Sequence, residues 1–166
     1  LVPVRQALSD AKEQQEPYYR TDHHWTSFGA FTGYQAWAAS LGLDSFKPSD
    51  FQQETVSDHF LGTIHSKLNI PVQADSIVLY RPKKEPVWSV YYDGSDSPVP
   101  SLYSMEALNT RDQYRVFLDG NHGWTKIKSS CFANTKTDAE ITRQNPSTSS
   151  TDFLAPSRIR SCFPAP

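Results

Sequence analysis

The chain has 166 residues, of which 20% are charged, and a formal net charge of −2 at pH 7. This length suits one domain with a hydrophobic core, and the near balance of charges without a basic run disfavours a nucleic-acid partner. No stretch is long and apolar enough to predict a transmembrane helix, and the two cysteines, Cys131 and Cys162, do not indicate a redox compartment.

The first third of the chain predicts helices on either side of an extended segment. Residues 1–15 have helical spacing of apolar positions, whereas residues 18–25 are rich in aromatic side chains and predict extended backbone. Thr26 or Ser27 can cap a second helix, whose apolar positions recur over residues 28–41. An α/β fold is therefore expected.

The middle of the chain predicts short strands. Residues 51–70 indicate an irregular lobe, after which residues 76–80 and 87–92 are β-branched and aromatic and predict a β-hairpin insertion. Residues 104–109 suit a short helix, and residues 114–118 suit another strand.

The character of the sequence changes after residue 128. Residues 129–166 are rich in Ser, Thr and Pro and lack apolar periodicity, which predicts a disordered, low-complexity tail. We therefore expect residues 1–128 to form the folded domain.

A short run near the N-terminus, Asp22-His23-His24-Trp25, has the composition of an acid–base site. In an extended segment side chains two residues apart share a face, so Asp22 and His24 would point together and His23 away from them. A carboxylate that holds one imidazole nitrogen leaves the other free to accept a proton, as in a hydrolytic triad. We predict Asp22 and His24 as catalytic residues; the alternative is a structural knot in which Asp22 caps the following helix.

Residues beside this run and in a later turn are candidates for substrate binding: Tyr19, Arg20, Trp25, Asn121 and His122. Tyr19 and Arg20 suit an acyl or phosphate group, although an arginine next to an aspartate is more often its ion-pair partner. Trp25 can stack on a sugar ring or form a wall of the core. Asn121 and His122 can hold an oxyanion or a substrate hydroxyl, or they can simply belong to a turn.

The spacing of the histidines disfavours a metal site. His24, His59, His65 and His122 do not show the i, i+4 pattern or another compact ligand spacing. We expect neither a metal nor a cofactor.

Three blocks in chain order carry a family likeness: residues 18–25, 56–63 and 116–122. They resemble the signature blocks of the bacterial DHHW family, which is similar to SGNH-type O-acetyltransferases and esterases of cell-envelope polysaccharides, including the alginate O-acetylation proteins. The resemblance implies a partial flavodoxin-like SGNH domain with helices over a parallel core. It also implies that Asp22 and His24 are the acid and base of a Ser-His-Asp site.

The serine block of that family is missing from this chain. The family places its serine on a strand-to-helix turn, whereas Ser147, Ser149 and Ser150 lie in the Ser/Thr/Pro-rich tail. We interpret residues 129–166 as a frameshifted or mispredicted end, which predicts a chain that is inactive as written.

The function expected from the resemblance is O-acetyl transfer to, or removal from, an envelope polysaccharide. Its partners would be a carbohydrate or acetyl-ester substrate and an acetyl-donor protein in the membrane. Its location would be the cell envelope or the extracellular space, with an upstream part of the protein expected because the chain begins without Met. The alternatives are a non-catalytic carbohydrate-binding or surface protein that uses Trp25, Tyr18 and Tyr19, and an inactive truncated product.

Overall fold

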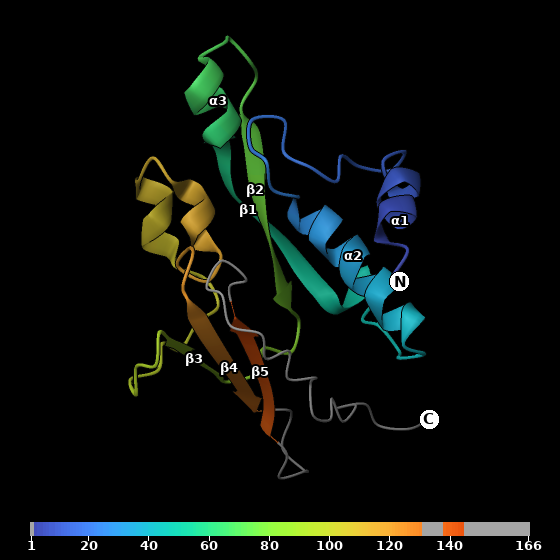
Figure 1. The fold of residues 1–166 in the computed structure, drawn as a ribbon, viewed down its shortest axis with the longest axis vertical. Coiled ribbons are helices and arrows are strands. Elements are labelled where there is room, and N and C mark those ends of the chain that lie inside the picture. Colours follow the sequence, from blue (N-terminus) through green and yellow to red (C-terminus); the bar gives the residue numbers. More distant parts are fainter. Residues whose placement is uncertain (1, 131–137, 145–166) are drawn as a thin grey trace. The chain divides into compact units, whose positions relative to one another are not determined.

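A computed structural model describes residues 2–130 and 138–144 of the chain (Figure 1). The chain divides into two compact units. The first unit consists of Leu1–Lys83 with Leu108–Tyr114, and the second of Lys84–Ala107 with the described part of Arg115–Pro166. The expected boundary at residue 128 stays a prediction.

Two helices of the first unit pack against each other: α1 (Val4–Ala11) and α2 (Ser27–Ser40). Thr26 is the N-cap of α2, and its hydroxyl oxygen accepts the Gly29 N–H at 3.1 Å. The predicted second helix is thus confirmed nearly to the residue. The first helix ends before residue 15, because the residues after Ala11 are polar and offer nothing to bury.

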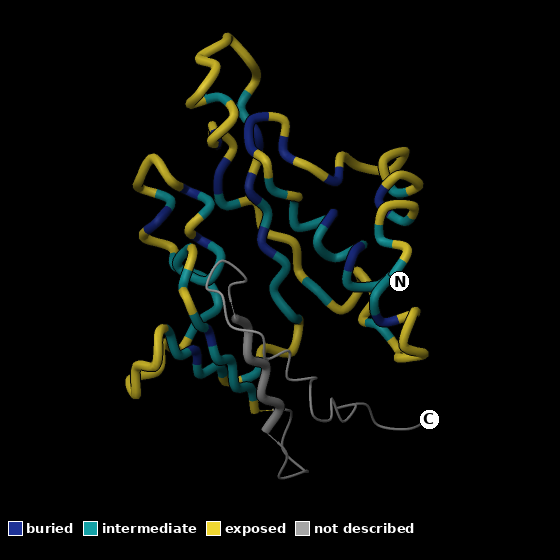
Figure 2. Tube along the Cα trace, viewed as in Figure 1, coloured by how far each residue is buried: buried dark blue, intermediate teal, exposed yellow. Residues whose placement is uncertain are grey.

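A two-stranded antiparallel sheet completes the core of the first unit. Strand β1 (Phe51–Phe60) pairs with β2 (Asp75–Pro82), and the short helix α3 (Thr63–Leu68) lies between them in sequence. Helix α2 contacts β2, and the Ser27 hydroxyl donates to the Val78 carbonyl at 2.5 Å. The buried residues of this unit lie mainly on the two strands and on the loop before α2 (Figure 2).

The predicted hairpin between residues 76–80 and 87–92 is wrong in its pairing, although both segments are strands. Strand β2 pairs with β1, whereas β3 (Trp88–Tyr92) pairs with β4 (Trp124–Ser130). Pro82 is the last residue of β2 and Pro86 lies in the connection, and neither has the N–H that a continuing ladder needs. All described strand pairs are antiparallel, so these residues do not include the parallel core that we expected.

The second unit contains a three-stranded sheet in the order β3-β4-β5, and Val90 of β3 is fully buried. Strand β5 (Asp138–Gln144) pairs with the whole of β4 and lies within the segment predicted as a tail. The rest of that segment beyond Ser130, including its candidate serines, lies outside the described residues.

Two short 3₁₀ helices, η2 (Met105–Asn109) and η3 (Gln113–Val116), lie in the chain between β3 and β4. The first confirms the predicted short helix, whereas the second replaces the predicted strand at residues 114–118. The reason is the backbone that follows: Leu118, Asp119 and Gly120 have φ values of 53°, 54° and 95°, which a strand does not contain. The described residues therefore form a partial α/β domain, and the expected fold class is confirmed.

Gly29 provides a test of how α2 is seated. A Cβ at this position would overlap the Pro17 carbonyl, which is backbone and cannot rotate away. We expect Gly29→Ala to destabilise the protein by about 1–3 kcal/mol in urea unfolding, although Gly→Ala within a helix normally stabilises. Gly33→Ala is the matched control, because its Cβ would meet only the side chains of Trp25 and Val4. Equal stabilisation by both changes would contradict this packing.

Candidate functional site

The Asp22-His23-His24-Trp25 run lies in a closed loop rather than in an extended strand. Tyr18 and Trp25 form an antiparallel bridge, the Tyr19 N–H donates to the His24 carbonyl at 3.1 Å, and the Thr26 N–H donates to the Pro17 carbonyl at 2.9 Å. The residues between Tyr19 and His24 consequently form the tip of a narrow loop. The extended conformation predicted for residues 18–25 is wrong, because these bonds bring the two ends of the segment together.

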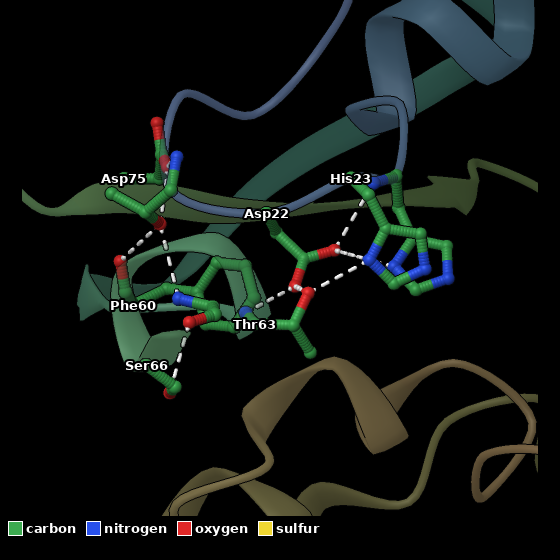
Figure 3. A network of polar contacts seen from close by, with 9 residues as sticks. Asp22, His23, Phe60, Thr63, Ser66 and Asp75 are labelled. Carbon is green, nitrogen blue, oxygen red and sulfur yellow. Dashed lines mark hydrogen bonds and ion pairs between the residues drawn. The ribbon is translucent and has the colours of Figure 1, made fainter. Parts of the chain in front are cut away.

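A buried carboxylate anchors the tip of this loop to the sheet. Asp75, at the first position of β2, accepts the Thr21 N–H at 2.8 Å and the Thr21 hydroxyl at 2.6 Å, and it also accepts the Arg20 N–H at 3.2 Å. The Thr21 carbonyl in turn accepts the N–H groups of Ile64 and His65 in α3, at 3.0 and 3.1 Å. The loop is thereby tied to β2 and α3 (Figure 3).

Asp22 and His24 are in direct contact, as the sequence predicted. The Asp22 Oδ1 atom accepts the His24 backbone N–H at 3.0 Å and lies 2.5 Å from His24 Nδ1. The Oδ2 atom accepts the Thr63 N–H at 2.7 Å and the Thr63 hydroxyl at 3.0 Å. Figure 3 shows the Asp22 side chain between Thr63 and the imidazole rings. A Cβ at Gly62 would overlap this carboxylate, so the site requires a glycine there for space.

These hydrogen bonds set the charge of the Asp22–His24 pair. Burial raises the pKa of Asp22, but the hydrogen bonds from Thr63 and His24 outweigh burial and hold the pKa below its usual value. An ionised Asp22 accepts the Nδ1–H of His24, which leaves the Nε2 lone pair of the imidazole as the proton acceptor. The pair therefore has the arrangement of a base and the carboxylate that orients it.

His23 lies beside the pair, which corrects the expectation that it points away. Its Nδ1 atom is 2.7 Å from the Thr63 hydroxyl oxygen and 3.6 Å from Asp22 Oδ1, and its ring centre lies 3.9 Å from that of His24. The alternation of side chains in a strand does not apply within a closed loop. His24 also stacks on Tyr114, with ring centres 3.9 Å apart and an interplanar angle of 9°, so two rings contact its imidazole.

Asp22, His23 and His24 are close enough to be considered as metal ligands, because one ligand atom from each lies within 4.8 Å of the others. The Asp22 oxygens, however, already accept bonds from His24 and Thr63. A metal bound through His24 Nδ1 would have to displace the proton that this carboxylate accepts. The geometry therefore suits proton transfer better than metal binding.

Tyr19 and Arg20, both predicted to bind substrate, make contacts that hold the fold together. Tyr19 is 4% exposed and packs edge-on against Phe60, with ring centres 5.2 Å apart, and burial raises the pKa of its hydroxyl. Arg20 forms an ion pair with Asp75 at 3.4 Å, so its partner is an aspartate distant in sequence rather than the adjacent Asp22. A substrate-binding role for these two residues stays a prediction that the placement of Tyr19 in the core does not favour.

Trp25 lies at the surface, where it is 40% exposed. It lines a groove of about 510 Å³. The remaining lining comes from α1 and the loop that follows it: Val4, Arg5, Leu8, Ser9, Lys12, Glu16, Pro17 and Tyr18. The inner part of the Trp25 ring rests near Gly33 of α2. One part of the Trp25 ring thus packs near α2 and the ring also lines the groove, and its stacking on a sugar stays a prediction.

Asn121 and His122 belong to the second unit. His122 Nδ1 is 2.9 Å from Asp93 Oδ2, and the imidazole stacks on Tyr92 with ring centres 4.0 Å apart. Asn121 follows the turn of positive φ values at residues 118–120 and is exposed. These contacts give His122 a local partner, and its predicted contact with substrate remains a prediction.

Three residues of the site were not singled out from the sequence: Thr63, Asp75 and Tyr114. Thr63 belongs to a block that carried the family likeness, but its spacing from Asp22 gave no reason to connect the two. Asp75 and Tyr114 lie about 50 and 90 residues from the residues that they contact. Such contacts depend on the fold and have no local pattern.

Residues 1–97, which include this site except for Tyr114, match the family described as the SGNH hydrolase-like domain of the acetyltransferase AlgX. The chain belongs to this SGNH hydrolase-like family. The DHHW and SGNH likeness inferred from the three sequence blocks is thereby confirmed.

A solved structure supports the fold of this SGNH hydrolase-like chain. A DHHW family protein from Eubacterium siraeum DSM 15702 is similar to it, with a TM-score of 0.61 and 20% sequence identity. The similarity covers 80% of this chain and 45% of that protein, so this chain spans less than half the length of its structural neighbour. No curated protein matches the chain. Among the described residues, no helix has the length and apolar character needed to cross a membrane.

The depressed pKa of Asp22 predicts a pH-dependent stability. A group whose pKa is lower in the folded than in the unfolded state stabilises the protein above its unfolded pKa, and this contribution is lost as the pH falls through the folded pKa. We expect Asp22→Asn to lower the free energy of unfolding by about 1–3 kcal/mol near neutral pH. The difference from wild type should shrink as the pH falls toward about 3. Urea unfolding at several pH values tests this, and a difference independent of pH would contradict it.

Proposed function

We propose that Asp22 and His24 form the acid–base pair of an SGNH-type acyl-transfer site that acts on O-acetyl groups of cell-envelope polysaccharides. The 2.5 Å contact between Asp22 Oδ1 and His24 Nδ1 carries this proposal. It directs the Nε2 lone pair away from the carboxylate, as a general base requires. The family match to an acetyltransferase domain supports the choice of acyl chemistry.

The proposed chemistry needs a serine as the nucleophile. The serine oxygen would attack the acetyl carbonyl while His24 Nε2 takes its proton, and Asp22 would stabilise the imidazolium that forms. His24 would then return the proton to the departing alcohol, and a water or sugar hydroxyl would release the acetyl group by the reverse steps. No serine hydroxyl bonds His24 within the described residues, and Ser66 donates to the Gly62 carbonyl at 3.1 Å. The nucleophile therefore has to come from another segment.

The partners and location of the complete protein follow from the same proposal. The substrate would be an acetylated carbohydrate or another acetyl ester, and a membrane protein would supply the acetyl group if the reaction is a transfer. The site would then work in the cell envelope or outside the cell. The family assignment supports the proposed location, while the whole activity belongs to a protein of which this chain resembles a part.

Hydrolysis of a chromogenic acetate ester tests the proposal. The measurement compares this chain with a version in which a strand–turn–helix segment bearing the serine of a family member replaces residues 145–166, so that β4 and β5 are kept. We expect serine-dependent hydrolysis only in the extended protein, and a loss of about 10³-fold or more in its His24→Ala variant, because the base is removed. His59→Ala is the matched control, since this exposed histidine pairs with Asp58.

Two results would reject the acyl-transfer proposal. One is an extended protein that folds cooperatively but has no ester hydrolysis above background. The other is an extended protein whose rate is the same with His24 and with alanine at that position. Cooperative unfolding of each variant, measured in parallel, separates lost chemistry from a lost fold.

A second candidate function is carbohydrate binding without catalysis, and the groove beside Trp25 favours it. Trp25 and Tyr18 are 40% and 49% exposed and line the same groove. Flat aromatic faces at the surface suit the apolar faces of sugar rings. This function needs no nucleophile, so it suits the chain as written.

Substitution of Trp25 tests the carbohydrate groove. We expect Trp25→Ala to weaken the binding of an acetylated polysaccharide about tenfold in affinity electrophoresis, because the stacking face is lost. Trp37→Ala is the control, because Trp37 lies on α2 and does not line the groove. Equal binding by wild type and Trp25→Ala would remove the support for this function.

A further inference from the structure

Thr63 makes three polar contacts with two groups of the site although it lies about 40 residues further along the chain. Its N–H and its hydroxyl both donate to Asp22 Oδ2, at 2.7 and 3.0 Å. Its hydroxyl oxygen also lies 2.7 Å from His23 Nδ1. The side chain thus joins the carboxylate of the proposed acid–base pair to the neighbouring imidazole.

The protons of these groups can be assigned from their chemistry. A threonine hydroxyl has one hydrogen, and the ionised Asp22 offers only acceptors. The hydroxyl hydrogen therefore goes to Asp22 Oδ2, and the remaining contact requires His23 Nδ1–H to donate to the hydroxyl oxygen. His24 Nδ1–H donates to the other oxygen, Oδ1, at 2.5 Å. The result is a continuous chain of donors from His23 through Thr63 to Asp22, with His24 on the opposite oxygen.

We propose that Thr63 is a positioning residue of the Asp22–His24 pair, and that its hydroxyl helps to hold the Asp22 carboxylate in place and sets the tautomer of His23. This inference rests on the proposed acid–base role of the pair. The hydroxyl occupies Oδ2, so the carboxylate cannot rotate without losing two bonds to Thr63 as well as its bonds to His24. Oδ1 is therefore kept in place for His24.

The same assignment gives His23 a defined place. When His23 is neutral and its Nδ1–H donates to Thr63, its Nε2 atom carries no proton. The same holds for His24. The ring centres of His23 and His24 lie 3.9 Å apart, and His24 also stacks on Tyr114. Thr63 consequently helps to fix the His23 ring, which lies against the His24 imidazole proposed as the base.

Three variants separate the hydroxyl from the rest of the side chain. Thr63→Val keeps the shape and the backbone N–H but removes the hydroxyl, whereas Thr63→Ser keeps the hydroxyl. Thr32→Val is the matched control, because the Thr32 hydroxyl donates to the Phe28 carbonyl within α2 at 3.0 Å. The measurements, made on the full chain, are the NMR titration of the Asp22 carboxyl carbon and the ¹⁵N shifts of the His23 ring, which report its tautomer.

We expect Thr63→Val to shift the Asp22 titration upward, because a hydrogen bond that favours the charged form is lost. We also expect it to abolish the Nδ1–H preference of His23. Thr63→Ser and Thr32→Val should match wild type in both measurements. An unchanged titration and tautomer in Thr63→Val, or a Thr63→Ser variant that behaves like Thr63→Val, would overturn the proposal. Both measurements are independent of ester hydrolysis, so their outcome is separate from that of the acyl-transfer proposal.

Discussion

The carboxylate of Asp75 is the interaction on which the site depends. It is 7% exposed, and a buried carboxylate is costly unless donors surround it. Arg20 and Thr21 supply these donors through backbone and side-chain groups. Arg20 and Thr21 lie at the tip of the loop. Their hydrogen bonds to Asp75 therefore also fix the position of the next residue, Asp22. By anchoring the loop, Asp75 thus positions the carboxylate of Asp22, which in turn orients His24.

A second constraint is the space around Asp22. This carboxylate is 3% exposed, and its donors are the first residue of α3 and its own neighbour two residues later. Gly62 leaves the room that the carboxylate occupies. The hydrogen bonds from Thr63 and His24 favour the ionised form of Asp22, and the absence of a side chain at Gly62 leaves room for them. His24 needs an ionised partner if it is to act as a base, so the fold supplies the electrostatic condition for the proposed reaction.

The elements that the sequence predicted well are those whose boundaries depend on local chemistry. Helix α2 begins at a threonine cap and continues through a steady apolar pattern, and both signals are local. The predicted hairpin between β2 and β3 was wrong because the composition of a strand does not indicate which other strand it pairs with. The strand expected at residues 114–118 failed because Leu118 and Asp119 adopt left-handed backbone, a conformation that their residue types alone do not indicate.

For the candidate site, the sequence by itself indicated the Asp22–His24 pair, because a carboxylate and an imidazole two residues apart are near enough to meet, although the expected strand is a closed loop. It also determined the family, since three ordered blocks are specific where one tetrapeptide is not. Only the tertiary structure decided the rest: that His23 lies against His24, that Tyr19 is buried, and that Thr63, Asp75 and Tyr114 complete the site. The physical reason is distance along the chain, because hydrogen bonds and ring contacts between remote segments exist only after β1, β2 and α3 have brought them together.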